Sequence, residues 1–322
     1  MTLPASGAIS FNAINVELGV AGTTSANINQ ASYRTLAGVP SGAISLASFY
    51  GKANQFSFSI TTNQTNANLR TLAVAAGWNG TSKVVATINS GIYVYSTSTG
   101  TPGLTVDGSW PGGIFLTNNG YIQGQGGNGG NNGLGFGNPG STGGPAISLG
   151  VSVNITNNSY IGGGGGGGGS AVNFPGNTGG GGAGNGLGGS GNGYGPGASW
   201  SVINGKSSSS YGNGGNGGGT MPGVGGDGGS TASVNKGHYQ GYAGSAGGGG
   251  GGSDGRYGST GNGGSGGAAG GAASGGCGAG GGGWGASGGS STSGGGAGGK
   301  AINLNGFTAT FAVTGTVYGA VS

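Results

Sequence analysis

Hydrophobic and polar residues alternate over the stretch after residue 54 in the way that half-buried strands require. Phe56, Phe58 and Ile60 fall on one face of an extended chain, and Val84–Ile88 forms a short apolar run. A further strand is expected over Ile92–Tyr95 and a short helix over Leu69–Ala76. These elements predict a β-rich domain over residues 54–112.

The first 52 residues carry a helical spacing instead. Ser10 can cap a helix that places Phe11, Ile14 and Leu18 on one face. Two further helices are expected, over Asn29–Ala37 and from Ser45 to Gly51. About 50 residues bury too little apolar surface for a large core, so we predict a helical module over residues 1–53 that docks on another surface.

The whole chain has 96 Gly among 322 residues and only 4% charged residues. Most of this glycine lies in the rest of the chain, after residue 112. Short glycine runs with a three-residue period recur at 126–130, 214–218, 225–229 and 263–267. Three residues per turn is the polyproline II period, and glycine lets such helices approach closely because it lacks a Cβ atom. We therefore predict that residues 113–322 form a bundle of polyglycine II helices.

Apolar repeats interrupt the glycine. Leu116–Ile122 is copied at Ile155–Ile161, and Gly143–Leu149 is copied at Gly298–Leu304. Because these repeats supply the apolar and aromatic side chains that glycine lacks, we expect them to form strand pairs that frame the bundle. The predicted fold class is mainly β and irregular: a small helical N-terminal module, a β-rich middle domain, and a C-terminal polyglycine II helix bundle framed by β-strands.

Composition excludes several classes of protein. Four Trp, twelve Tyr and nine Phe argue against a disordered chain. A net charge of +4 without any basic run offers no nucleic-acid surface. No apolar stretch approaches the roughly 20 residues that span a bilayer, so we expect no membrane insertion. The lone Cys277 allows no intramolecular disulfide. The first residues lack a signal-peptide pattern, so release from a cell is expected by another route, such as lysis.

The candidate contact residues interrupt the glycine with rings, charges and amides. They are Tyr194, Trp200, Lys206, Tyr211, Lys236, His238, Tyr239, Tyr242, Asp254, Arg256, Tyr257 and Trp284. Such side chains adapt to sugars or protein loops, and rings on a rigid scaffold are typical binding anchors. The alternative is that these rings only cover the glycine segments.

The sequence does not complete any of the catalytic motifs that its residues suggest. His238 has no second His for a metal site, and the spacing Gly294…Gly299-Lys300 of a phosphate-binding loop is followed by Ala301 where Ser or Thr is needed. With four acidic residues in the chain, a pairing of Asp227 with Asp254 is the one carboxylate arrangement left open. We expect no enzyme, no cofactor and no metal.

A family resemblance rests first on the N-terminus. The unit Ser6-Gly-Ala-Ile-Ser10 returns as Ser41-Gly-Ala-Ile-Ser45, followed by Ser48-Phe-Tyr-Gly51. This pattern resembles the N-terminal module of many virion proteins of tailed bacteriophages. The resemblance implies that residues 1–53 attach to other phage tail or baseplate proteins; otherwise they form a generic helical cap. Asn68–Ala73 and the stretch Gly108-Ser-Trp-Pro-Gly112 also resemble phage tail proteins.

The glycine-rich part is similar to distal tail-fibre adhesins of the T-even-like group, in which polyglycine II sandwiches carry receptor-contacting loops at one end. The resemblance implies a virion protein, made in the host bacterial cytoplasm and acting outside the cell. It would bind host lipopolysaccharide or an outer-membrane protein. The alternative is a structural tail-tip or baseplate component without receptor contact. Monomer and homotrimer both stay open.

Overall fold

The computed structural model describes residues 3–52, 54–78, 80, 82–133, 136–171, 179–184, 264, 269–273 and 278–322. Its N-terminal part holds α1 (Phe11–Glu17), α2 (Ala31–Ala37) and the 3₁₀ helix η1 (Leu46–Phe49). The Ser10 hydroxyl accepts a hydrogen bond from the Ala13 N–H at 3.2 Å and so caps α1, as its spacing predicts. These elements pack around a cluster of their own that includes Ile14, Tyr33 and Phe49.

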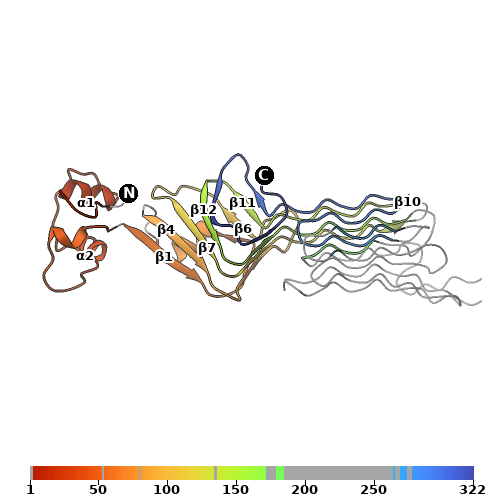
Figure 1. The fold of residues 1–322 in the computed structure, drawn as a ribbon, viewed down its shortest axis with the longest axis horizontal. Coiled ribbons are helices and arrows are strands. Elements are labelled where there is room, and N and C mark those ends of the chain that lie inside the picture. The colour runs from red at the N-terminus through yellow and green to blue at the C-terminus, as the bar shows by residue number, and fades with distance from the viewer. Residues whose placement is uncertain are drawn as a thin grey trace, which may run out of the picture.

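From residue 55 onward the chain coils through three parallel β-sheets (Figure 1). The first turn holds β1 (Gln55–Ile60), β2 (Gln64–Thr65), β3 (Ala67–Asn68) and then α3 (Leu69–Ala75). The second holds β4 (Lys83–Ile88), β5 (Tyr93–Tyr95) and β6 (Leu104–Val106); the third holds β7 (Ile114–Asn118), β8 (Tyr121–Gln123) and β11 (Ile147–Leu149). The fourth holds β12 (Val153–Asn157), β13 (Tyr160–Gly162) and β14 (Ile302–Asn303), and β15 (Ala309–Val313) and β16 (Thr316–Tyr318) complete the coil.

Each turn contributes its strands to the sheets in the same order. The first sheet is β1-β4-β7-β12-β15, the second is β2-β5-β8-β13-β16, and the third is β3-β6-β11-β14. All of these neighbours pair in parallel, which is the topology of a parallel β-helix. A two-stranded antiparallel ribbon, β9 (Asn132–Gly133) with β10 (Phe136–Gly137), lies outside the three sheets.

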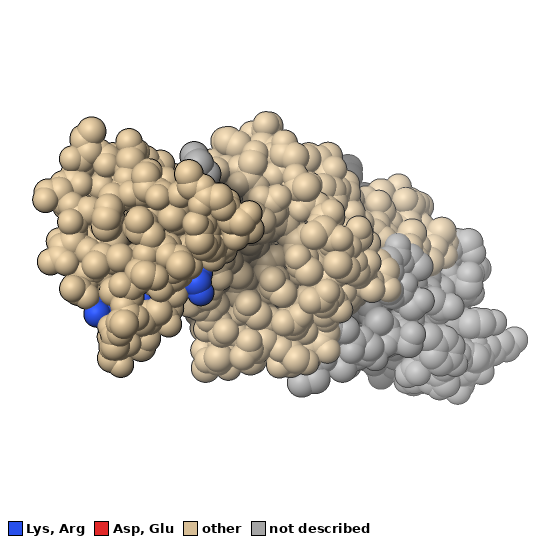
Figure 2. All heavy atoms as spheres, turned by 60° about the vertical axis from the view of Figure 1, so that its left-hand side comes forward, with Lys and Arg blue, Asp and Glu red and all other residues tan. Residues whose placement is uncertain are grey.

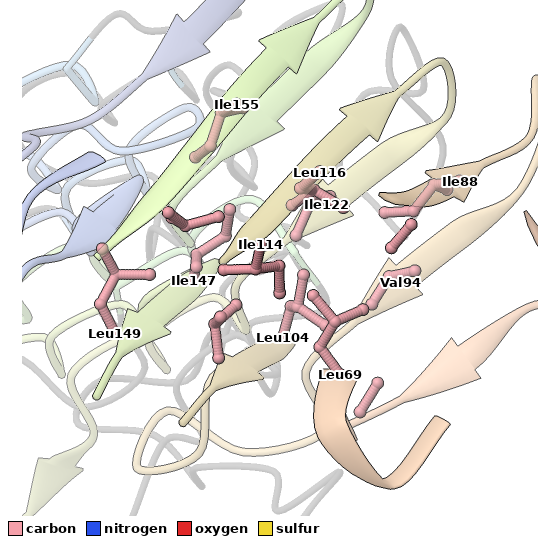
Figure 3. Packing of buried hydrophobic residues seen from close by; sticks show 14 of the residues in the cluster. Leu69, Ile88, Val94, Leu104, Ile114, Leu116, Ile122, Ile147, Leu149 and Ile155 are labelled. Atoms are coloured by element: carbon pink, nitrogen blue, oxygen red, sulfur yellow. The ribbon is translucent and has the colours of Figure 1, made fainter. Parts of the chain in front are cut away.

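The core lies inside the coil, where side chains from successive turns stack on one another (Figure 3). In the first sheet Ala86, Leu116 and Ile155 occupy one register line. Equivalent lines run through Val94, Ile122 and Ile161 in the second sheet and through Leu104, Ile147 and Ile302 in the third. All nine are fully buried, because alternate residues of each strand point into the coil.

A buried asparagine pair explains why one heptapeptide occurs twice. Asn118 and Asn157 lie at the same corner of successive turns, between the first and second sheets. The Asn118 Nδ2 donates to Asn157 Oδ1 at 2.8 Å, and Asn157 Nδ2 donates to the Thr314 carbonyl at 2.6 Å. The two copies are therefore consecutive turns of one coil.

The predicted fold class is wrong. Strands after residue 112 were expected to frame a separate helix bundle, but β7 pairs with β4 and the strands of both parts form the same three parallel sheets. No polyglycine II helix bundle is evident among the described residues. The reason is that strands with matching apolar patterns pair one turn apart, whereas a short glycine period specifies only backbone freedom. The runs at 214–218 and 225–229 lie outside the described residues, as does 263–267 except for Gly264.

Glycine segments continue from the strand ends as extended chain, seen to the right of the sheets in Figure 1. Residues 164–169, shortly after β13, are hydrogen-bonded to six other segments. The N–H groups of residues 164–169 donate in order to the carbonyl oxygens of Gly144, Ala183, Ala286, Ser141, Gly180 and Gly289. Carbonyl oxygens of residues 164–169 accept from Gly299, Gly127, Gly282, Gly296, Gly130 and Ala279. Each of the six segments thus forms two hydrogen bonds with residues 164–169, through two of its own residues that are three positions apart.

This packing requires glycine. A Cβ atom on Gly166 would overlap the carbonyl oxygen of Gly296, and one on Gly164 would overlap that of Gln125. The neighbouring backbones approach so closely that no side chain fits between them. The glycine part is therefore a scaffold stabilised by backbone hydrogen bonds, with few side chains of its own.

Candidate functional site

Eleven of the twelve predicted contact residues lie outside the described residues. They are Tyr194, Trp200, Lys206, Tyr211, Lys236, His238, Tyr239, Tyr242, Asp254, Arg256 and Tyr257. The ends of the intervening stretch are held by the scaffold: the Gly184 carbonyl accepts from the Gly126 N–H at 2.6 Å, and the Gly264 N–H donates to the Gly281 carbonyl at 2.9 Å. The stretch between them thus begins and ends on packed backbone.

Trp284 is the remaining predicted contact residue, and its position does not fit that role. Its side chain is 2% exposed. The indole packs edge-on against Tyr160, with ring centroids 5.7 Å apart, and Ala183 belongs to the same buried cluster. Trp284 therefore fastens two glycine turns to the second sheet, and a ring that is buried in this way has no surface left for a receptor.

The outer side of the second sheet carries a row of tyrosines. Since Val94, Ile122 and Ile161 point into the coil, the residues on either side of them point outward. Register places Tyr93 beside Tyr121 and Tyr121 beside Tyr160. It likewise places Tyr95, Gln123, Gly162 and Tyr318 on one line. We call Tyr93, Tyr95, Tyr121, Gln123, Tyr160 and Tyr318 the tyrosine face.

Ring contacts join most of this face. Tyr93 stacks on Tyr121 with centroids 4.6 Å apart and planes 20° from parallel. Tyr160 makes edge contacts with Tyr121 at 6.3 Å and with Tyr318 at 5.3 Å. Tyr160 is buried, while Tyr93, Tyr95, Tyr121 and Tyr318 are partly exposed. Trp284 covers Tyr160 in the middle of this row, so the partly open rings are Tyr93, Tyr95 and Tyr121 on one side of it and Tyr318 on the other.

Polar atoms without partners lie within the tyrosine face. Gln123 is 1% exposed, and neither its amide nitrogen nor its amide oxygen has a hydrogen-bond partner; the same holds for the hydroxyl of Tyr160. Burial, and then the neighbouring Tyr318, raise the pKa of Tyr160 far above its ordinary value. Burial and the neighbouring Tyr121 also raise the pKa of Tyr93. Both phenols therefore stay protonated and neutral at physiological pH.

Two surface hollows lie elsewhere. One, of about 610 Å³, is lined by α3 and the end of β6 and includes Arg70, Val74 and Asp107. The Arg70 guanidinium lies over the Trp78 ring, 5.8 Å from its centroid. The other, of about 500 Å³, includes Arg34 and Pro40 in the N-terminal part.

Charge is sparse on the described surface. Figure 2 shows few basic atoms and no acidic ones on the face that it draws. Among the described residues no three His, Cys, Asp or Glu side chains gather as a metal site. His238, Cys277, Asp227 and Asp254 lie outside those residues. In the described part of the chain, no helix has the length and apolar character to cross a membrane.

Sequence reasoning missed the tyrosine face. The alternation Tyr93-Val-Tyr95 indicates only a strand, and Tyr121 and Tyr160 are only equivalent positions of a repeat. Their common face follows from parallel register across five strands, which no local pattern contains. The signal that was available is that these repeats conserve Tyr at one position while the next residue is always apolar.

Comparison with known proteins places the chain among the tail fibre proteins of bacteriophages. The family model of the phage tail fibre adhesin Gp38 matches residues 55–246, more than half of the chain. The chain therefore belongs to the Gp38 tail fibre adhesin family. The expected adhesin function is confirmed at this level, and the alternative of a tail component without receptor contact is set aside.

No curated protein matches the chain. Among solved structures, the gp37–gp38 adhesin tip complex of the bacteriophage S16 long tail fibre is similar, with 20% sequence identity and a TM-score of 0.46. The alignment covers 99% of this chain and 100% of that one.

Proposed function

We propose that this adhesin recognises the host bacterial surface through the rings, charges and amides between residues 194 and 257, presented by the glycine scaffold. The observation that carries the proposal is that backbone N–H and carbonyl groups inside the glycine scaffold are already hydrogen-bonded to one another. The N–H and carbonyl groups of residues 164–169 are all hydrogen-bonded to six neighbouring segments. Glycines packed in this way have neither side chains nor free backbone groups for recognition, so we assign the contacts to the residues that interrupt the glycine.

The anchoring of both ends supports this assignment. Gly184 and Gly264 are each hydrogen-bonded into the scaffold. The scaffold therefore holds the chain on both sides of the candidate contact residues. Lys236, His238, Tyr239 and Tyr242 form its densest group of rings and charges, with Asp254, Arg256 and Tyr257 close behind in the sequence.

The test is adsorption of the purified full-length chain to host cells. The triple variant K236A/Y239A/Y242A removes two rings and one charge, and we expect at least a tenfold loss of binding because anchor residues of this kind carry most of an interface's energy. F307A is the control, since Phe307 is 40% exposed between β14 and β15. Equal binding by the triple variant and the wild type would refute the proposal, provided both melt at the same temperature.

The receptor class is decided by the same assay. Two classes are open, host lipopolysaccharide and an outer-membrane protein. Adsorption is compared on host strains that lack the polysaccharide or the major porins, and loss on only one strain identifies the class.

We also propose that residues 1–53 attach the adhesin to other tail or baseplate proteins of the virion. This part packs around its own cluster at Ile14, Tyr33 and Phe49. Val16 and Val20, in and just after α1, are 46% and 44% exposed, which suits a surface that another protein covers. Removal of residues 1–53 should leave particles without the adhesin while the purified remainder still binds cells; particles that retain it would refute the attachment role.

A further inference from the structure

The tyrosine face has features that packing alone does not explain. Three buried polar atoms, two on Gln123 and one on Tyr160, lack hydrogen-bond partners. A buried polar atom without a partner costs about 1–3 kcal/mol, and folded proteins keep few of them. Here they are concentrated at one place on one sheet, beside partly exposed rings.

Gly162 brings these atoms together. It stands between Gln123 and Tyr318 on one register line and has no side chain to fill the space. The Tyr160 hydroxyl lies over it, 2.7 Å from the position that a Cβ atom would take. The amide and the hydroxyl therefore converge on the outer side of a glycine, next to the buried cluster of Tyr160, Ala183 and Trp284 against which the rings of Tyr121 and Tyr318 pack.

The chemistry of the face limits what can bind there. No strand of the second sheet contains Lys, Arg, Asp or Glu. Open phenol rings offer flat apolar surface and a hydroxyl at the edge, and the amide offers both a donor and an acceptor. From β5 to β16 the rings extend over three strand spacings, about 14 Å. A neutral ligand with alternating C–H surface and hydroxyl groups, longer than one sugar ring, complements all of these features.

We propose that the tyrosine face is a saccharide-binding site for a neutral oligosaccharide, formed by other residues than the contact residues between 194 and 257. The sugar rings stack on Tyr93, Tyr121 and Tyr318, and a hydroxyl of the ligand pairs with the Gln123 amide and the Tyr160 phenol. Because the two polar groups are nearly closed off, rotation of one partly exposed ring, Tyr121 or Tyr318, admits the ligand hydroxyl. Lateral binding to surface glycans would hold the fibre tip against the cell while the other contacts engage.

The test uses the full-length chain with neutral hexasaccharides of glucose, galactose and mannose, and measures saturation transfer from tyrosine ring protons to sugar protons by NMR. We expect binding of at least one hexasaccharide. Y121A should weaken it about tenfold, the value of one good aromatic contact. F307A, which removes an exposed ring elsewhere, should bind as the wild type does. The absence of binding to all three hexasaccharides would overturn the proposal.

Q123M separates a ligand-binding role from a structural one. Methionine fills a similar volume without polar atoms, so the variant should melt at the same or a higher temperature and yet bind the hexasaccharide more weakly. Unchanged affinity in Q123M would overturn the role of the amide. The triple variant K236A/Y239A/Y242A should keep its saccharide binding even where it no longer adsorbs to cells, so failure of one proposal is distinguishable from failure of the other.

Discussion

An alanine at Gly166 tests the packing of the glycine segments directly. Gly166 lies within 163–169, and an added Cβ atom would overlap the carbonyl oxygen of Gly296. The Gly166 N–H donates to Ala286 at 2.9 Å and its carbonyl accepts from Gly282 at 2.8 Å. Relief of the overlap requires that neighbouring segments move apart, which breaks or lengthens these bonds.

The magnitude follows from two opposing effects. Two hydrogen bonds lost in the interior cost about 1–3 kcal/mol each, because the separated groups have no other partner. Alanine restricts the unfolded chain and so returns only about 0.4–1 kcal/mol. The net expected loss is about 2–5 kcal/mol, which lowers the melting temperature by roughly 5–15 °C.

The control is the same substitution at Gly294. A Cβ atom there meets no atom within 4 Å, and its φ is not in the left-handed region. G294A should therefore match the wild type or melt slightly higher, by the unfolded-state effect alone. Thermal melting followed by circular dichroism measures both variants. If G166A and G294A melt together, the close approach of the segments is not what stabilises this part of the chain.

Three further predictions concern the coil and its outer face. N157L removes the buried contacts to Asn118 and the Thr314 carbonyl and should cost about 2–4 kcal/mol in urea unfolding; a loss below 1 kcal/mol would show that the pair contributes little. W284A leaves a cavity beside Tyr160 and should cost about 3–5 kcal/mol by the same method, whereas F307A should cost less than 1. The pKa of Tyr160 in the folded protein is raised above the ordinary value of 10.0. The free energy of unfolding therefore keeps the full contribution of this phenol below pH 10 and falls as the pH rises further, because the phenol ionises in the unfolded chain first. Y160F should flatten that alkaline loss; an unchanged pH profile would contradict the assignment.

The helical module illustrates what local sequence predicts well. Ser10 caps α1 and Gly38, at φ 71°, ends α2, as the spacing indicated, because caps and left-handed glycine are properties of a few neighbouring residues. The strands at residues 55–60, 83–88 and 93–95 also follow from their alternation. The candidate contact residues other than Trp284 lie outside the described part and remain predictions.

The repeats were recognised but misplaced. Leu116–Ile122 and Ile155–Ile161 share a pattern because they pair with each other in successive turns of the coil. The repeated pattern alone identifies neither the sheet to which each strand belongs nor whether the pairing is parallel. The burial of Trp284 is hidden in the sequence for a similar reason, since a ring between glycines gives no sign of the Tyr160 side chain that packs against it.

By itself the sequence determined the helical module, the positions of several strands and a glycine part too poor in side chains to recognise anything alone. Only the tertiary structure decided that these strands form one parallel coil, that Trp284 is buried, and that tyrosines from successive turns share one face. The physical reason is that caps and alternation depend on neighbours in the chain, whereas register and burial depend on contacts between residues up to 159 positions apart, such as Asn157 and Thr316.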